Sequence, residues 1–410
     1  MTGAAAALER AYRDERAAVL ATLARHLGGN LELAEDAVQD AFAEAARDWP
    51  RRGVPERPGA WLTVAARRRA IDRIRRERGL TDRLEALVRF DDDHDDKDAD
   101  ETALHDDRLR LIFTCCHPAL SVEGRTALTL RTLGGLQVPE LARAFLTSEP
   151  AMQQRIVRAK RKIAAAGIPY RIPPDDQLPE RLAGVLRVVY LVFNEGHTAT
   201  AGERLLRTEL CDEAVRLARL LAELMPDDAE TLGLLALLLL TDARRAARTD
   251  RAGAMVALGE QDRTRWDARR IEDGVAALDR ALRLRRPGPY QLQAAIAALH
   301  AGAPSVEATD WPQIAALYRA LHAHEPSPVV TVNGAVAGAL AWGPQAGLRM
   351  LARAERDGRL EGYQPLHAAR AELLRRAGDL QAARAAYDRA IALSANERER
   401  AELERRALAT

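Results

Sequence analysis

The chain has 410 residues and a net charge of +1, with 47% hydrophobic, 30% charged and only 4% aromatic residues. This composition excludes a disordered chain and favours helices over strands, and the length suits two or three domains. No apolar run approaches the roughly 20 residues that cross a bilayer, and residues 1–27 lack the apolar block of a secretory signal, so we expect a cytoplasmic protein without membrane contact.

Residues 8–49 carry apolar residues at helical spacing, which predicts two or three helices with a break at Gly28-Gly29-Asn30. The last of these helices begins at Leu31 and ends near Trp49-Pro50. Because its apolar positions lie beside a run of acidic ones, we expect one face to pack in a core and the other to stay polar.

A polar turn over residues 51–59 leads into a helix that is predicted over residues 60–78. Its buried stripe is expected to contain Trp61, Leu62, Val64, Ala65, Ile71 and Ile74. Seven arginines against two acids between Arg67 and Arg78 give a local charge of +5, which favours contact with nucleic-acid phosphates.

Residues 79–105 are interpreted as a charged linker, in which residues 81–89 can form one short helix. Ten acids against one lysine give residues 91–107 a local charge of −9. Such a segment repels DNA, so it is not expected to be a DNA contact itself.

Residues 106–168 are predicted to form a compact helical domain. A short helix over 138–145, a turn over 146–149 and a basic helix over 150–166 have the layout of a helix-turn-helix, with Ser148 as the cap of the basic helix. Six bases and no acid fall within residues 150–171. Two basic blocks separated by an acidic one predict two nucleic-acid contacts.

Residues 178–410 are rich in alanine and leucine and are predicted to form helices broken by glycine and proline, with a buried helix at Leu234–Leu240. Two sets of small and apolar residues have the offsets of a tetratricopeptide hairpin, one well matched and one weakly: Gly378, Ala383, Tyr387 and Ala390, and Gly274, Leu278 and Ala281. They indicate a helical-repeat-like domain without fixing the number of repeats.

Three stretches carry a resemblance to a known family: LELAEDAVQDAFAEAARDW (31–49), WLTVAARRRAIDRIRR (61–76) and residues 137–163. They resemble, in this order, the core-polymerase-binding helix, the minus-ten-reading helix and the minus-thirty-five-reading region of extracytoplasmic-function (ECF) sigma factors of the sigma-70 family. The long helical tail is similar to a subgroup with a C-terminal tetratricopeptide-like extension, in which the extension governs activity.

The resemblance implies two partners, core RNA polymerase and promoter DNA, and three groups of site residues. The implied polymerase-binding residues are Glu32, Glu35, Asp36, Val38, Gln39, Asp40 and Phe42. Those implied to bind the minus-ten element are Trp61, Arg67, Arg68, Arg69, Asp72, Arg75 and Arg76. Those implied to bind the minus-thirty-five element are Glu149, Ala151, Gln153, Gln154, Arg155, Arg158, Arg161 and Lys162.

The chemistry of these residue types supports that division. Arginine pairs naturally with guanine and glutamine with adenine in the major groove, while Arg161 and Lys162 are expected on phosphate. Met152 and Ile156, on the same helix, are expected in the core.

Several alternatives stay open. Trp61 either packs in the core or stacks on a base, and Asp72 either accepts a base amino group or pairs with an arginine of its own helix. The acidic linker either occupies a positively lined polymerase channel, as the resemblance implies, or is a solvated tether. Arg68 stands where the family commonly has asparagine and Phe145 where it has a small residue, so minus-ten preference and turn packing are expected to differ.

The sequence also admits two rival interpretations. An enzyme would use Glu195-Gly-His197 with Cys211 or His300, but no nucleophile elbow, phosphate loop or paired metal-ligand spacing accompanies them, and Cys115-Cys116-His117 is too cramped for a tetrahedral site. We therefore expect no catalytic residue, metal or cofactor. The alternative is a DNA-binding regulator with a helix-turn-helix and a helical-repeat sensor, which does not bind polymerase. It leaves the acidic helix over residues 31–49 and the arginine-rich segment over residues 67–78 without a role.

The sequence thus predicts an all-α protein in four segments. Residues 1–78 are expected to form a region 2-like domain, 79–105 the acidic linker, 106–172 a region 4-like helix-turn-helix domain and 173–410 the tetratricopeptide-like extension. We expect the extension to contact the sigma domains or the polymerase and to set activity.

Overall fold

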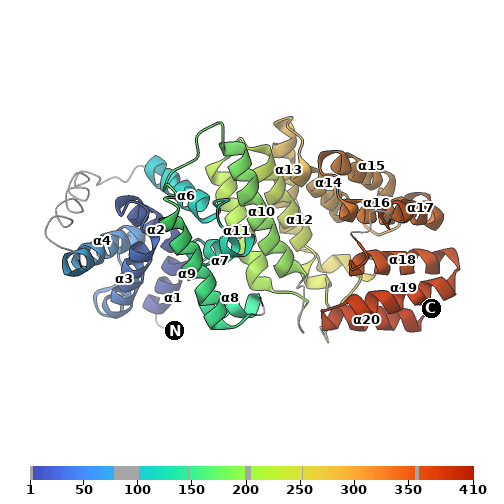
Figure 1. Cartoon of the computed structure of the whole chain (residues 1–410), viewed down its shortest axis with the longest axis horizontal. Helices are drawn as coiled ribbons and strands as arrows, with labels where there is room; N and C mark the ends of the chain where they lie inside the picture. The colour runs from blue at the N-terminus through green and yellow to red at the C-terminus, as the bar shows by residue number, and fades with distance from the viewer. Residues whose placement is uncertain (1–2, 78–100, 146, 199–204, 252, 356–359) are drawn as a thin grey trace. The chain divides into compact units, whose positions relative to one another are not determined.

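The structure, a computed structural model, describes residues 3–77, 101–145, 147–198, 205–251, 253–355 and 360–410. These residues form α-helices and three short 3-10 helices, with no β-strand among them (Figure 1). The predicted all-α fold class is therefore confirmed. None of the described helices is long and apolar enough to cross a membrane. The chain divides into two units, unit 1 (Met1–Val189) and unit 2 (Tyr190–Thr410).

The first half of unit 1 contains α1 (Gly3–Asp14), α2 (Arg16–His26), α3 (Leu31–Arg52) and α4 (Pro58–Glu77). Apolar residues that recur at helical spacing on α2 and α3 form its core, and Leu20 and Ala34 are fully buried. The Asn30 side chain caps α3 by accepting a hydrogen bond from the Leu33 N–H at 3.1 Å. This cap satisfies one of the backbone donors that every helix leaves free at its start.

Helix α3 ends later than predicted, at Arg52 instead of near Trp49-Pro50. Pro50 removes one backbone hydrogen bond from the last turn but does not stop the helix. The buried Trp49 packs edge-to-face on Trp61 with ring centroids 5.8 Å apart, which holds this turn against α4. The helix stops at Gly53, whose φ of 87° favours glycine.

The second half of unit 1 contains α6 (Glu101–Cys115), α7 (Val122–Thr132), α8 (Val138–Ala144), α9 (Glu149–Ala165) and the first part of α10 (Leu178–His197). Ser148 caps α9, since its hydroxyl accepts from the Ala151 N–H at 3.3 Å, as predicted. The predicted helix-turn-helix layout is also present, as α8, a short turn and α9. Helix α6 begins within the predicted linker, and the rest of that segment, including residues 81–89, lies outside the described residues.

Among its described residues, unit 2 continues α10 with ten further α-helices that pack on their neighbours along the chain (Figure 1). They are α11 (Thr208–Leu224), α12 (Ala229–Asp242), α13 (Ala268–Arg283), α14 (Pro289–Gly302), α15 (Trp311–His324), α16 (Pro328–Trp342), α17 (Pro344–Glu355), α18 (Gln364–Ala377), α19 (Leu380–Leu393) and α20 (Glu397–Leu408). The predicted buried run Leu234–Leu240 forms most of the second half of α12 and is buried.

The small residues singled out in the sequence lie where helices approach closely. A Cβ atom added at Gly274 on α13 would lie 2.7 Å from Leu240 Cγ on α12, so only glycine allows this approach. On α19, Ala383 and Ala390 are fully buried and Tyr387 is 1% exposed. The packing of these positions is the one expected from their spacing, while the assignment to tetratricopeptide repeats stays a prediction.

Candidate nucleic-acid interface

Helix α9 has one buried face and one face of exposed polar residues. Met152 and Ile156 are 0% and 3% exposed, which confirms that they belong to the core. On the other face Arg155 is half-buried, and Arg158 donates a hydrogen bond to Gln154 Oε1 at 3.1 Å. The remaining residues predicted to bind the minus-thirty-five element are all exposed: Glu149, Ala151, Gln153, Gln154, Arg158, Arg161 and Lys162.

A groove of about 590 Å³ lies between α9 and the start of α7. Arg155, Arg158 and Lys162 line it together with Ser121, the residue that caps α7, and one carboxylate, Glu123. Cations beside the start of a helix attract an anion, because the free N–H groups and the helix dipole add to the charge. The groove can therefore accommodate a phosphate backbone beside the exposed face of α9.

Several arginines of α4 pair with acidic residues on α3. Arg69 pairs with Glu44 at 2.6 Å and Arg73 with Asp36 at 2.9 Å, and Arg68 also pairs with Glu44. Such partly exposed ion pairs contribute only about 0–1 kcal/mol each, so phosphates can replace the acids at little cost. Of the other predicted residues, Arg67 and Asp72 are half-buried and Arg75 is exposed, while the side chain of Arg76 lies outside the described residues.

A pocket of about 340 Å³ opens beside Trp61, between α4 and the end of α3. Trp49, Trp61 and Val64 give it apolar surface and Arg68 gives it a positive charge. Trp61 is half-buried, so it packs on Trp49 and also lines the pocket. The prediction that Val64 is buried is wrong: it is 68% exposed, because it lies about 200° around the helix from the buried Leu62.

The residues predicted to bind polymerase fall on two sides of α3. Glu32, Gln39 and Asp40 are exposed and Asp36 is half-buried. The other three are buried within unit 1, at 3%, 1% and 7% exposure: Glu35, Val38 and Phe42. Because a partner can reach only exposed side chains, the first four residues define the accessible part of this surface in the observed arrangement.

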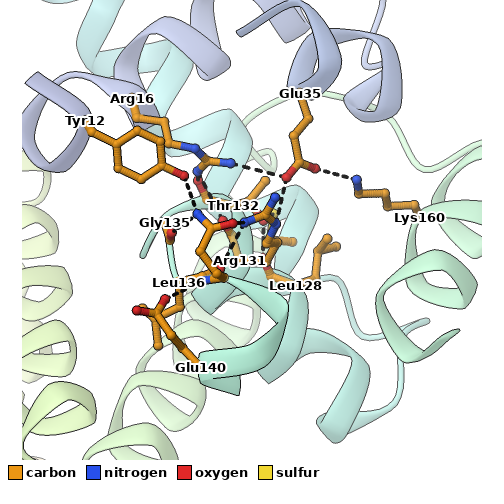
Figure 2. Close-up of polar contacts among 12 residues, drawn as sticks. Tyr12, Arg16, Glu35, Leu128, Arg131, Thr132, Gly135, Leu136, Glu140 and Lys160 are labelled. Carbon is orange, nitrogen blue, oxygen red and sulfur yellow. Dashed lines mark hydrogen bonds and ion pairs between the residues drawn. The ribbon is translucent and has the colours of Figure 1, made fainter. Parts of the chain in front are cut away.

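Glu35 is the centre of a buried ion network that joins α3 to the helix-turn-helix (Figure 2). Its carboxylate pairs with Arg16 at 3.3 Å, with Arg131 at 2.9 Å and with Lys160 of α9. Arg16 also donates to the Thr132 carbonyl oxygen at 2.8 Å. Burial acts to raise the pKa of Glu35, but the surrounding cations outweigh it and lower that pKa, so the carboxylate stays charged.

Other polar contacts join the same two halves of unit 1. The Tyr170 hydroxyl donates to the Ala21 carbonyl oxygen at 2.9 Å, and Arg25 pairs with Asp107 at 3.1 Å. Near the ion network, the Gln137 side-chain amide donates to the Tyr12 hydroxyl oxygen at 2.7 Å.

Comparison with known proteins relates these halves to known families. The family model for Sigma-70 region 2 matches residues 12–79, and that for Sigma-70, region 4 matches residues 110–163. Residues 181–282 match a family of unknown function, DUF6596. The chain is 48% identical over 376 residues to "Uncharacterized protein R00370" of Rhizobium meliloti (strain 1021), which covers 91% of this chain and 88% of the relative. No solved structure matches the chain.

Regions 2 and 4 therefore lie on one chain, in the order in which the two basic helices were found. The chain belongs to the sigma-70 family. Region 2 contains the acidic and arginine-rich helices α3 and α4, and region 4 contains α7, α8 and most of α9. These regions give the sigma-70 protein a role in promoter recognition.

Sequence analysis of this sigma-70 protein missed the partners of Glu35. The available signal was Arg16, which begins the run RAAVLATLA and is only 2% exposed. A charge within an apolar stripe needs a buried partner. The partner itself was not deducible, because Lys160 and Glu35 are 125 positions apart.

The cysteines of the sigma-70 protein have structural surroundings. Cys115 and Cys116 are buried and bond to the hydroxyl groups of Thr132 at 3.4 Å and Thr129 at 3.3 Å. Burial raises the pKa of Cys115 to about 12 and that of Cys116 to about 11, so both remain protonated thiols at neutral pH. A thiol in that state is a poor nucleophile and a poor metal ligand.

His197, Cys211 and Asp242 bring possible ligand atoms within 4.8 Å of one another. However, Asp242 pairs with Arg245 at 2.8 Å and with Arg270. Burial, together with neighbouring arginines, lowers the pKa of His197 well below its usual range. Because a metal cation would meet concentrated positive charge there, these residues do not fit a metal centre.

Proposed function

We propose that this sigma-70 protein is an ECF-type sigma factor that binds core RNA polymerase and directs it to promoters. The main support is the presence of region 2 and region 4 on one chain, each with a basic helix that has an exposed polar face. A regulator that only binds DNA needs one such element and has no use for an acidic docking helix beside it.

In this proposal α4 reads the minus-ten element. Its arginines exchange their acidic partners on α3 for phosphates, and the pocket beside Trp61 receives a base that has left the stack. Extrusion of a base costs a few kcal/mol, which stacking on an aromatic ring and hydrogen bonds can offset. Trp61 supplies the ring and Arg68, 58% exposed, supplies donors at the same pocket.

Helix α9 reads the minus-thirty-five element from the major groove. In this proposal Arg155 and Arg158 contact base edges, Arg161 and Lys162 contact phosphates, and the DNA backbone passes along the groove at the start of α7. Polymerase binds the exposed acidic side of α3, which consists of Glu32, Asp36, Gln39 and Asp40.

We assign residues 173–410 to a tetratricopeptide-like extension that sets activity by contact with the sigma domains or the polymerase. The other proposed segments are 1–78, 79–105 and 106–172, as in the sequence prediction. Sigma-70 family proteins are not enzymes, and we assign no catalytic step to this chain. Its proposed site of action is the cytoplasm, where the polymerase and the promoter DNA are.

Run-off transcription with purified core polymerase tests this function. The full chain is expected to produce a promoter-specific transcript and to co-elute with the core enzyme. The double change Glu32→Lys and Asp40→Lys is expected to abolish co-elution, whereas Glu223→Lys, an exposed acid on α11, leaves it intact. Specific DNA binding without transcript or co-elution would instead support the DNA-binding regulator.

A further inference from the structure

Unit 2 contains a cavity of about 380 Å³ that the proposed promoter recognition does not use. Helices α12, α14, α15 and α16 surround it, and Leu237, Ile296 and Leu321 contribute to its apolar walls. Small-molecule sites usually have about 300–1,000 Å³, apolar walls and a few polar groups that fix the orientation of the ligand. The cavity has the size and the walls of such a site.

Arg244, just past the end of α12, lines this cavity, and its guanidinium has no hydrogen-bond or ion-pair partner among the described residues. Its neighbour Arg245 shows the usual arrangement, since it pairs with Asp242 and with Asp212, each at 2.8 Å. Burial, aided by nearby Arg263, lowers the pKa of Arg244 to about 10, so it is still charged at neutral pH. Arg244 is half-buried, and a partly desolvated cation without an acid beside it leaves its donors available to an anion.

Tyr318 lines the same cavity, and its hydroxyl likewise has no partner among the described residues. Burial raises the pKa of Tyr318 to about 12, so the hydroxyl is a hydrogen-bond donor at neutral pH. His300 is also in the wall and, with a pKa lowered to about 4 by burial and by Arg244 and Arg263, is neutral. One carboxylate, the exposed Glu325, belongs to the lining.

We propose that this cavity binds a small organic carboxylate, whose charged group pairs with Arg244 and accepts a hydrogen bond from Tyr318. Arginine matches a carboxylate because its planar fork donates two parallel hydrogen bonds. The apolar walls cover the hydrocarbon body of the ligand. The lining has one arginine without a counterion, while its histidine is neutral and its one acid is negative. This balance of charge suits a ligand with a single negative charge better than a phosphate with two.

The ligand would contact side chains of α12, α14, α15 and α16 at the same time, so its binding would stabilise the packing of these helices on one another. A regulatory effect on transcription would rest on the proposed sigma function. Ligand binding itself does not, and it is therefore tested without polymerase or DNA.

Calorimetric titration of the full chain tests the site with phenylacetate, hexanoate and indole-3-acetate. At least one of these carboxylates is expected to bind saturably, at least tenfold more tightly than its alcohol analogue, and inorganic phosphate more weakly still. Arg244→Gln is expected to weaken that binding at least tenfold and Tyr318→Phe severalfold. The control Arg319→Gln, an exposed arginine on α15 outside the cavity lining, is expected to leave it unchanged.

A second measurement separates a ligand site from a structural role of Arg244. Without ligand, Arg244→Met is expected to melt at the same or a higher temperature, because a half-buried charge without a counterion is removed. Three results would each overturn the proposal: no saturable binding of any of the three carboxylates, binding that persists in Arg244→Gln, or a phosphate that binds more tightly than they do. A loss of thermal stability in Arg244→Met would do so as well, since it would show that the arginine serves the fold.

Discussion

Glu35 holds a full negative charge at 3% exposure, between Arg16, Arg131 and Lys160. Whether such a network adds net stability depends on how completely the cost of desolvation is recovered. Once formed, however, it is sensitive to the loss of a single member, because the remaining buried charges then have no counterion.

The change Glu35→Gln is expected to destabilise unit 1 by about 3–5 kcal/mol, the typical cost of removing one partner from a buried ion pair. Hydrogen–deuterium exchange of peptides from α3 and α7 should show it as protection reduced on the order of 100-fold or more. Asp36→Asn is the matched control on the same helix, since its pair with Arg73 is about 40% exposed and should contribute less than about 1 kcal/mol. Equal effects of the two changes would contradict this account.

The stability of unit 2 is expected to depend on pH through Glu372 on α18. Burial acts to raise its pKa, but hydrogen bonds from Arg375 and Arg376 outweigh it and lower the pKa to about 2. Because the pKa is depressed in the folded state, the stabilisation is complete above about pH 4.5 and is lost as the pH falls toward 2. The lowering of this pKa from 4.5 to about 2 corresponds to about 3 kcal/mol in the free energy of unfolding.

Acid titration of exchange protection in α18 and α19 measures this contribution. Glu372→Gln should show little change between pH 4.5 and 2.5, where the parent protein loses protection. Asp388→Asn, which removes a mostly exposed pair with Arg384, should retain the parent's pH profile. A parent profile that is flat over this range would show that Glu372 is not held ionised by its arginines.

At the scale of the element, α9 uses its faces for different purposes. Met152 and Ile156 anchor it, Lys160 pairs with Glu35, and the exposed arginines face solvent. Arg155→Ala and Arg158→Ala are each expected to change which minus-thirty-five base pairs are preferred, by about 1–3 kcal/mol at one position. Arg161→Ala should weaken all sequences alike and reduce the salt dependence by about one unit.

Binding to a set of promoter fragments with single base-pair changes, at two salt concentrations, distinguishes these outcomes. If all three changes weaken every fragment equally, the division of α9 into base-contacting and phosphate-contacting arginines is wrong.

Local patterns predicted the elements well and the contacts between them poorly. Helix α12 followed from its continuous apolar run, which is typical of a helix buried on all sides. The core face of α9 followed from periodicity, because burial of one helix face repeats along the chain. The length of α3 did not, because Trp49 packs on a residue of another helix and carries the helix past Pro50. The Glu35 network and the cavity at Arg244 bring together residues far apart in sequence, and no local pattern reports such proximity.

At the scale of the whole molecule, loss of unit 2 is expected to change promoter-specific transcription about fivefold or more, the usual lower range of coupling between sites. One truncation ends after Pro174. A second ends after His197 and keeps α10, whose Arg181 donates to the Phe113 carbonyl oxygen at 2.7 Å within unit 1. Run-off transcription and core-polymerase affinity are measured for both. If neither quantity changes in either truncation, unit 2 does not set activity.

The burial of all three cysteines has a practical consequence. Because thiols react with maleimides as exposed thiolates, the native protein offers no fast-reacting labelling position. One cysteine introduced at Ala46 on α3 and another at Ala165 on α9, both exposed positions outside the proposed binding surfaces, would thus accept a fluorescent donor and acceptor while the native cysteines stay in place. Energy transfer between these dyes would report directly whether regions 2 and 4 separate when the protein meets polymerase.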